Sequence, residues 1–203
     1  MSSSPANASE LILASSSPRR AALLDQIGVS YRVRAIDVDE TWHVGEDPAD
    51  YVQRLALVKA RAAASLVEAG APVLGADTAV VLAGEVLQKP RDRNDALAML
   101  ARMSGRSHQV MTAVALVRAK KAQEALRLSI STVSFREISA AEAHAYWESG
   151  EPRDKAGAYA IQGCGAVFVS RIEGSYSGVV GLPLFETAQM LRKQGILPRF
   201  DMQ

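Results

Sequence analysis

Three serines, a proline and two arginines follow the first apolar segment of the chain. The run Leu11–Ala14 predicts a buried strand, and Ser17 and Pro18 are typical of a helix N-cap and a first helical residue. Unpaired backbone N–H groups at a helix start attract anions, whereas the helix dipole disfavours Arg19 and Arg20 there by about 0.3–1 kcal/mol each. A bound polyphosphate would reverse that penalty, so the segment predicts an anion site. The alternative is that both arginines are solvated.

Asp77 is the acidic residue that apolar patterning explains least. It interrupts the apolar segment 73–82, where an unpaired charge would be costly. We therefore expect it just beyond the end of a strand, facing a crevice where open α/β sheets bind ligands. The alternative is a hydrogen bond to a neighbouring turn. Lys59, at the margin of a predicted apolar helix stripe, could bring its ammonium group to the same edge. Lys89 precedes Pro90, which favours an extended backbone at Lys89. Taken alone, this residue is more typical of a solvated lysine.

The segment 154–163 joins two charged residues to glycines that permit close approach by a ligand. Loops of this composition are usually functional or mobile. Other kinds of site find no support in the sequence. The three histidines show no metal-ligand spacing, and neither a P-loop motif nor a serine-hydrolase elbow motif occurs.

The chain has 203 residues, 48% of them hydrophobic, and a formal net charge of +1. Its near-neutral charge argues against a nucleic-acid binder, and no apolar stretch is long enough to cross a bilayer. The single cysteine, Cys164, precedes small residues and predicts a packed thiol in a reducing, cytoplasmic setting. Residues 1–9 predict a flexible N-terminal tail, and residues 10–198 a single continuous domain.

Strand-like and helix-like segments alternate in the first part of this domain. Asp47 and Pro48 mark one helix start, and Ser139 with Glu142 has the spacing of a capping box. Two long strand candidates, 108–118 and 125–137, predict a hairpin. The other expected elements are helices over 18–27, 48–68, 92 or 94 to 103, 140–149 and 183–193, and strands over 11–14, 31–35, 73–82, 86–87 and 167–172.

An ordered set of motifs resembles the Maf (septum formation) family of nucleoside triphosphate pyrophosphatases. The motifs are Ser15–Arg20, Asp39–Glu40, Lys59–Arg61, Gly75–Thr78, Gln88–Arg91, Ser104–Gly105, Asp154–Gly157 and Gly181–Pro183. One such motif would carry little weight, but the set runs from about Leu11 to Leu191 and covers nearly the whole chain.

The resemblance implies an α/β enzyme with an elongated mixed β-sheet, flanking helices and two lobes around a central cleft. It implies hydrolysis of a nucleoside triphosphate to the monophosphate and pyrophosphate with a divalent cation, Mg²⁺ or Mn²⁺. A house-cleaning role follows, with a link to arrest of cell division. The expected partner is the nucleotide, without nucleic acid or membrane, and a homodimer is compatible with the family.

The resemblance also assigns roles to the residues of the matching motifs. Asp77 would be the proton acceptor and, together with Glu40, a metal ligand, unless Glu40 instead orients water. The residues expected to bind phosphate are Ser17, Arg20, Lys59 and Lys89, and those expected to set base preference are Arg19, Thr78 and Gln162. Cations beside a metal suit the electrostatic demands of phosphoryl transfer.

Arg19 is the residue that favours the dTTP/UTP branch of the family. A branch similar to 7-methyl-GTP pyrophosphatases commonly has Trp at this position, which suits stacking on a cationic purine. Arg19 would instead be repelled by a methylated guanine and can donate to a carbonyl oxygen. Uracil and thymine also offer acceptors and a donor that the amide of Gln162 can pair.

Two positions depart from the family pattern, and a second function stays open. Val58 stands where many relatives have Glu, which shifts any metal-binding role toward Glu40 or Asp39, and Ser16 stands where Gly is frequent. The alternative function is a non-catalytic nucleotide-binding regulator of septum formation that acts through a protein partner. Asp77 favours the enzyme, because a carboxylate beside phosphates hinders binding unless it handles a proton or a metal.

Overall fold

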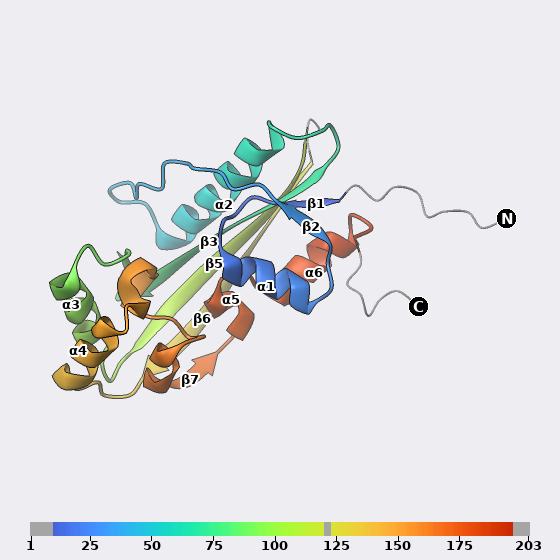
Figure 1. Cartoon of the computed structure of the whole chain (residues 1–203). Coiled ribbons are helices and arrows are strands. Elements are labelled where there is room, and N and C mark those ends of the chain that lie inside the picture. Colours follow the sequence, from blue (N-terminus) through green and yellow to red (C-terminus); the bar gives the residue numbers. More distant parts are fainter. Residues whose placement is uncertain (1–9, 120–122, 197–203) are drawn as a thin grey trace.

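A computed structural model describes residues 10–119 and 123–196 of the chain. The predicted tail, part of the hairpin turn and the last residues of the predicted domain lie outside these ranges. The described part is built on one seven-stranded mixed sheet in the order β2-β1-β3-β5-β6-β7, with β4 paired to β3 (Figure 1). The strands are β1 (Leu11–Leu13), β2 (Tyr31–Val33), β3 (Pro72–Leu82), β4 (Glu85–Leu87), β5 (Ser107–Arg118), β6 (Glu124–Phe135) and β7 (Val169–Glu173).

The outer edge of β3 is covered only at its two ends. β1 runs parallel to β3 and pairs with Val73 and Leu74, while β4 is antiparallel and pairs with residues 80–82. On the other side, β5 pairs with β3 along nearly its whole length. Residues 75–79 therefore face a gap in the sheet between β1 and β4. This gap positions the candidate site.

Side chains of β3 alternate between two cores, one on each face of the sheet. Val73, Ala79 and Val81 pack against α2 (Pro48–Ala64). Leu74 and Val80 belong to the larger core on the other face, to which the remaining α-helices contribute. Those helices are α1 (Pro18–Gln26), α3 (Arg93–Met103), α4 (Ala140–Glu148), α5 (Tyr176–Val180) and α6 (Leu184–Arg192).

Gly75 brings α2 unusually close to the sheet. A Cβ atom built on Gly75 would lie 2.8 Å from the backbone nitrogen of Ala60 and closer still to the carbonyl oxygen of Ala56. Such contacts leave no room for a side chain. The helix therefore packs directly on the bare backbone of β3, one pleat before Asp77 on the same face.

The predicted helix starts are confirmed where local capping signals exist. Helix α1 begins at Pro18 after Ser17, although the Ser17 hydroxyl makes no capping hydrogen bond. At the start of α2, the Asp47 carboxylate accepts the Ala49 N–H at 2.8 Å. The capping box of α4 forms as expected, with its N-cap at Ser139.

One helix end was predicted wrongly, and one helix was not predicted. Helix α2 ends at Ala64 instead of continuing to about residue 68, and the chain then turns so that the Gly70 N–H bonds to the Ala119 carbonyl at 2.7 Å. That contact aligns the chain for β3. Helix α5 was missed altogether. Its span, Tyr176–Val180, is too short to show a helical period in the sequence.

Cys164 was also misassigned, because its thiol is exposed instead of packed. It opens a 3-10 segment, Cys164–Phe168, in which Gly165 and Phe168 are the buried residues. Two further 3-10 turns, Glu151–Asp154 and Ala156–Ala158, precede it.

The long strands connect two ends of the molecule with different coverings. In Figure 1, α3 and α4 lie together at one end, whereas β1, β2 and α6 lie toward the other. This arrangement agrees with the expected elongated α/β architecture. Within residues 10–119 and 123–196, no helix has the length and apolarity to span a membrane.

Candidate active site

A cavity of about 540 Å³ opens at the gap in the sheet between β1 and β4, and we call it the cleft. Its lining comes from segments that are far apart in the chain, including the start of α1, the middle of β3 and the segment after α4. All the residues proposed from the sequence line it: Ser17, Arg19, Arg20, Glu40, Lys59, Asp77, Thr78, Lys89 and Gln162. The structure thus brings the predicted set together in one place.

Asp77 lies in the middle of β3, not beyond a strand end as expected from the sequence. The strand continues without interruption because β5 satisfies its backbone on one side while β1 and β4 leave the other side open at this point. The side chain of Asp77 is 10% exposed and faces α2, where the Lys59 ammonium donates to its Oδ1 at 2.6 Å. The buried charge is thereby paired, which offsets part of its desolvation cost.

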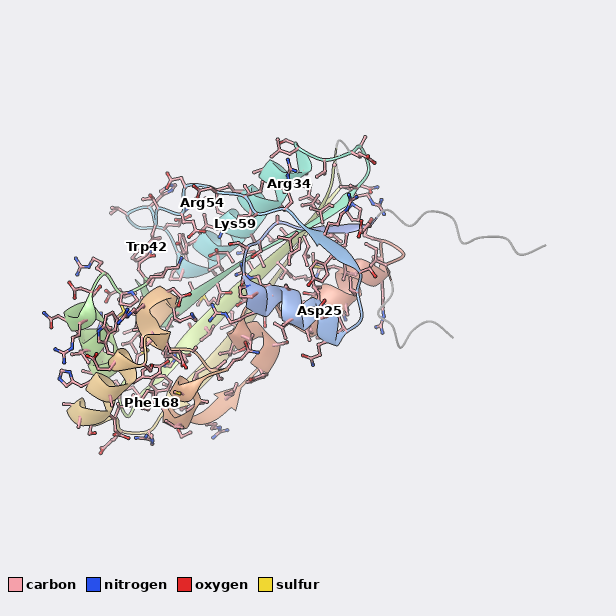
Figure 2. All side chains as sticks on the ribbon, in the orientation of Figure 1. Asp25, Arg34, Trp42, Arg54, Lys59 and Phe168 are labelled. Atoms are coloured by element: carbon pink, nitrogen blue, oxygen red, sulfur yellow. The ribbon has the colours of Figure 1, made fainter. Side chains whose placement is uncertain are left out.

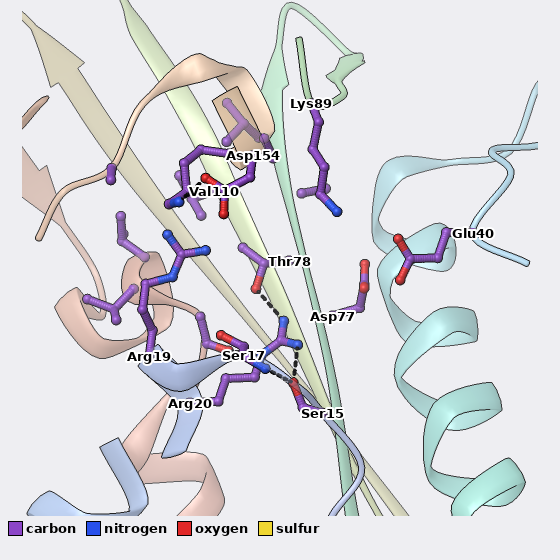
Figure 3. Close-up of a pocket in the computed structure, with 18 of the residues that line it drawn as sticks. Ser15, Ser17, Arg19, Arg20, Glu40, Asp77, Thr78, Lys89, Val110 and Asp154 are labelled. Carbon is purple, nitrogen blue, oxygen red and sulfur yellow. Dashed lines mark hydrogen bonds and ion pairs between the residues drawn. The ribbon is translucent and has the colours of Figure 1, made fainter. Parts of the chain in front are cut away.

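Lys59 bridges two carboxylates. Its Nζ lies 2.5 Å from Oε1 of Glu40 and 2.6 Å from Oδ1 of Asp77. Glu40 comes from the loop before α2, and the Tyr51 hydroxyl donates to its backbone carbonyl at 3.0 Å. As expected, the aliphatic stem of Lys59 is buried and its ammonium reaches the cleft. Figure 3 shows Glu40 and Asp77 side by side at this wall.

The two carboxylates have pKa values shifted in opposite directions. Burial raises the pKa of Asp77, although the charges of Lys59 and Arg20 oppose the shift. Burial also acts to raise the pKa of Glu40, but the hydrogen bond and charge of Lys59 outweigh it and leave that pKa below its ordinary value. Carboxylates driven apart in this way are typical of sites where one group accepts a proton and the other stays charged.

Arg20 is held in place by three acceptors from three different segments. Its Nε donates to the Gly181 carbonyl at 2.9 Å. Nη1 donates to Ser15 Oγ and Nη2 to Thr78 Oγ1, both at 3.2 Å (Figure 3). A guanidinium has five N–H donors, so one hydrogen on each terminal nitrogen stays available for a ligand. Burial lowers the pKa of Arg20, with Asp77 acting against the shift, and the side chain stays charged.

Thr112 of β5 supports the Thr78 hydroxyl behind Arg20, and it was not predicted from the sequence. Its hydroxyl lies 2.8 Å from the Gly178 carbonyl and 3.0 Å from Thr78 Oγ1. The Thr112 hydroxyl is the donor in both contacts, so these two oxygens share its single proton. Thr78 Oγ1 therefore accepts from both Thr112 and Arg20. A hydroxyl within the apolar run 110–117 was the signal that could have revealed this residue.

The remaining cations of the cleft have fewer partners. Within the described ranges, neither Arg19 nor Lys89 forms a hydrogen bond or ion pair, although the charge of Lys89 contributes to the lowered pKa of Glu40. Figure 3 shows Lys89 and Arg19 entering the cleft from opposite sides, with Arg19 toward Asp154. Both side chains are free to meet a bound anion.

The wall opposite Lys59 contains packed aromatic rings. Tyr159 lines the cleft, and its hydroxyl lies 2.8 Å from Nε2 of the buried His108. Phe135 packs edge-to-face on both rings, each at a centroid distance of 4.8 Å. Burial lowers the pKa of His108 to about 4. Figure 2 shows Phe168, which also contacts Phe135, at the α4 end of the molecule, away from Lys59 on α2.

The glycines of the segment 154–163 serve a different purpose from the one expected. A Cβ on Gly157 would lie 2.9 Å from Val80, and one on Gly163 would collide with the Glu151 carboxylate. These glycines therefore make room for protein side chains and not for a ligand. Lys155 of the same segment lines the cleft and pairs with Asp154.

The donor set of the cleft fits a divalent cation only in part. Among the residues that the structure describes, no three His, Cys, Asp or Glu side chains come close enough together to hold a metal by themselves. Glu40 and Asp77 provide two neighbouring carboxylates, both held by Lys59. Magnesium commonly binds through one or two carboxylates together with substrate phosphates and water. The pair therefore fits Mg²⁺ or Mn²⁺ if a nucleotide supplies further ligands.

Two similar proteins from different bacteria have the same name. The chain is 57% identical over 188 residues to a dTTP/UTP pyrophosphatase of Saccharophagus degradans, with 91% of this chain and 89% of that protein covered. It is 51% identical over 185 residues to a dTTP/UTP pyrophosphatase of Vibrio cholerae, covering 91% of this chain and 98% of that protein.

Solved structures are more distant. A Ham1 protein of Staphylococcus aureus is 20% identical, with a TM-score of 0.42, and covers 64% of this chain and 72% of its own. A similarity of that size has no bearing on function. The family comparison, in contrast, spans almost the entire described chain. Residues 10–194 match the model of the Maf-like proteins, and the chain therefore belongs to the Maf family.

Proposed function

We propose that this chain is a nucleoside triphosphate pyrophosphatase that hydrolyses dTTP and UTP to the monophosphate and pyrophosphate. The observation that carries the proposal is the buried Asp77 carboxylate in a cleft lined by Arg20, Lys59 and Lys89. A triphosphate needs cations to offset its charge, and its hydrolysis needs a base for the attacking water. The dTTP/UTP pyrophosphatase names of the relatives agree with this chemistry.

Asp77 is the proposed general base. Lys59 occupies Oδ1, which leaves Oδ2 without a hydrogen-bond partner in the described part of the chain. Oδ2 can therefore accept the proton of a water that attacks the α-phosphorus, with pyrophosphate as the leaving group. The raised pKa of Asp77 strengthens it as a proton acceptor.

The phosphates are proposed to bind between Arg20 and Lys89, with Ser17 at the start of α1. Arg20 offers the two N–H groups that its protein partners do not use. Lys59 would join them by exchanging a carboxylate for a phosphate oxygen. A divalent cation held by Glu40 and Asp77 would neutralise charge on the phosphates and polarise the scissile bond.

Base preference is proposed to come from Arg19, Thr78 and Gln162. Thr78 Oγ1 already accepts from Arg20 and Thr112, so its own hydroxyl proton is available for a carbonyl oxygen of the base. The amide oxygen of Gln162 can accept the N3–H of uracil or thymine, whereas cytosine lacks that hydrogen. An unpaired group in the pocket would cost about 1–3 kcal/mol, which disfavours cytosine. We place the activity in the cytoplasm, as the single cysteine suits a reducing compartment.

A substrate panel tests the proposal. The values of kcat/KM should be highest for dTTP and UTP when compared with dCTP, GTP and 7-methyl-GTP in a pyrophosphate-release assay. EDTA should abolish turnover, and added Mg²⁺ or Mn²⁺ should restore it. A preference for dCTP or 7-methyl-GTP would contradict the base assignment. Tight nucleotide binding without pyrophosphate release would instead favour a non-catalytic regulator.

A further inference from the structure

A short loop carries Gln162 along the wall of the cleft. Ala160, Ile161 and Gln162 all line the cavity, and Gly163 follows them. No regular helix or strand includes these residues. Their position must therefore be set by contacts from outside the loop.

Both ends of this loop are bound to the same pair of side chains, Tyr146 and Glu151. At the first end, the Ala160 N–H donates to the Tyr146 hydroxyl oxygen at 3.0 Å. At the second end, the Cys164 N–H donates to Glu151 Oε2 at 2.8 Å, and the Gly165 N–H donates to Oε1 at 3.0 Å. The Tyr146 hydroxyl closes the network by donating to Oε1 at 2.6 Å. Residues 161–163 are thus a bridge between two anchored points.

The shape of the loop depends on the same two side chains. A Cβ on Gly163 would overlap the Glu151 carboxylate, and a Cβ on Gly165 would lie 2.5 Å from the Tyr146 hydroxyl. The backbone therefore wraps directly around the pair. Tyr146 is in turn fixed by the Phe168 ring, edge-to-face at a centroid distance of 5.1 Å.

The protonation states of the pair are well defined. Burial and the neighbouring Glu151 raise the pKa of Tyr146, so its hydroxyl keeps the proton that it donates. Burial acts to raise the pKa of Glu151, but the hydrogen bonds from Tyr146 and the two backbone N–H groups lower it overall. The carboxylate is therefore charged at neutral pH and accepts from every donor around it.

We propose that Tyr146 and Glu151 are positioning residues that determine pyrimidine selectivity by fixing the place of Gln162 in the cleft. The inference rests on the proposed function and on base recognition by Gln162. Neither Tyr146 nor Glu151 lines the cleft, so each acts through the loop and not on the substrate. Loosening the loop displaces the amide from the base while the phosphate contacts of Arg20 and Lys89 stay intact.

The test compares kcat/KM for UTP and CTP in four variants. Gln162→Ala gives the selectivity expected when the amide is absent. Glu151→Gln replaces one acceptor oxygen by a donor group, and Tyr146→Phe removes the acceptor for the Ala160 N–H. Glu142→Gln is the matched control. Like Glu151, Glu142 accepts a backbone N–H, but it lies at the start of α4, whereas Glu151 follows the end of that helix.

We expect the UTP-to-CTP ratio to fall about tenfold in Gln162→Ala, Glu151→Gln and Tyr146→Phe, as losing a buried hydrogen-bond partner costs about 1–3 kcal/mol. The loss should appear in KM for UTP, with kcat at saturating UTP near the wild-type value. Glu142→Gln should keep the wild-type ratio. Because both Glu151→Gln and Tyr146→Phe are measured, the test still gives a result if one of these variants does not fold.

Two results would overturn the inference. One is an unchanged ratio in both folded variants of the pair while Gln162→Ala shifts it. The other is an unchanged ratio in Gln162→Ala itself. Failure of the proposed function looks different, because the wild-type protein would then release no pyrophosphate from either dTTP or UTP, and the inference would fall with it.

Discussion

The two walls of the cleft are held together by opposite kinds of interaction. On one wall, Lys59 joins Glu40 and Asp77 through ionic contacts of 2.5 and 2.6 Å. On the other, the rings of His108 and Tyr159 pack edge-to-face at a centroid distance of 5.4 Å. Charged groups can exchange partners when a polyphosphate arrives, whereas packed rings cannot move without opening a void. Ligand binding should therefore rearrange the charged wall and leave the aromatic wall in place.

The largest effect is expected at the charged wall, from Asp77→Asn. The amide keeps the shape of the side chain but removes its basicity, so kcat for UTP should fall by about 10²–10⁴-fold. Because burial already disfavours the charged form of Asp77, the neutral variant should fold normally. Asp95→Asn is a suitable control, since Asp95 pairs with Arg91 outside the cleft and its loss should leave kcat unchanged. Near-wild-type turnover by Asp77→Asn would contradict its role as the base.

At the aromatic wall, the expected effect is on stability and depends on pH. Burial lowers the pKa of His108 from 6.5 to about 4, so between these values the unfolded chain binds a proton that the folded chain excludes. Stability should thus be fully present above pH 6.5 and decrease as the pH falls toward 4. Between pH 7 and pH 4.5 the wild type should lose about 2–3 kcal/mol more than His108→Gln.

Urea unfolding at both pH values measures this difference. The exposed His43 provides the control, because His43→Gln leaves the buried ring untouched. Equal losses in the wild type and His108→Gln would show that His108 does not resist protonation. Such a result would remove the basis for treating the aromatic wall as a fixed neutral surface.

The smallest effect is expected from Thr112→Val, at the boundary between the walls. Valine keeps the volume of the side chain but leaves the Gly178 carbonyl and the Thr78 hydroxyl without their partner. The guanidinium of Arg20 should then be less well oriented, and KM should rise by about fivefold for every triphosphate alike, since one hydrogen bond contributes about 1 kcal/mol. Thr112→Ser, which keeps the hydroxyl, should retain the wild-type KM. A rise confined to one base would contradict a role through Arg20.

Local signals in the sequence predicted most elements of the fold. Pro18, Pro48 and the Ser139 capping box define helix starts through contacts within a few residues, and all three were found as expected. The long hairpin was equally clear from its apolar strands. Helix α5 was missed because five residues contain little more than one helical turn.

The candidate site was harder to predict, because its geometry depends on contacts between distant segments. The charge of Asp77 suggested a strand end, but its tolerance inside β3 comes from Lys59 on α2 and from the early end of β1 at Leu13. Similarly, Gly163 looked like a ligand contact, and only the position of Glu151 explains it. Neither pairing has a signature in one sequence.

The cleft is sensitive to substitution at Gly75, a residue that has no side chain to take part in the chemistry. Adding one methyl group there would press on the backbone of α2 at Ala56 and Ala60 and lift the helix that carries Lys59. In a map of mutational tolerance across the chain, position 75 should therefore stand beside Asp77 among the least permissive sites. A variant with Ala at position 75 can then lose activity although every charged residue of the cleft is still present.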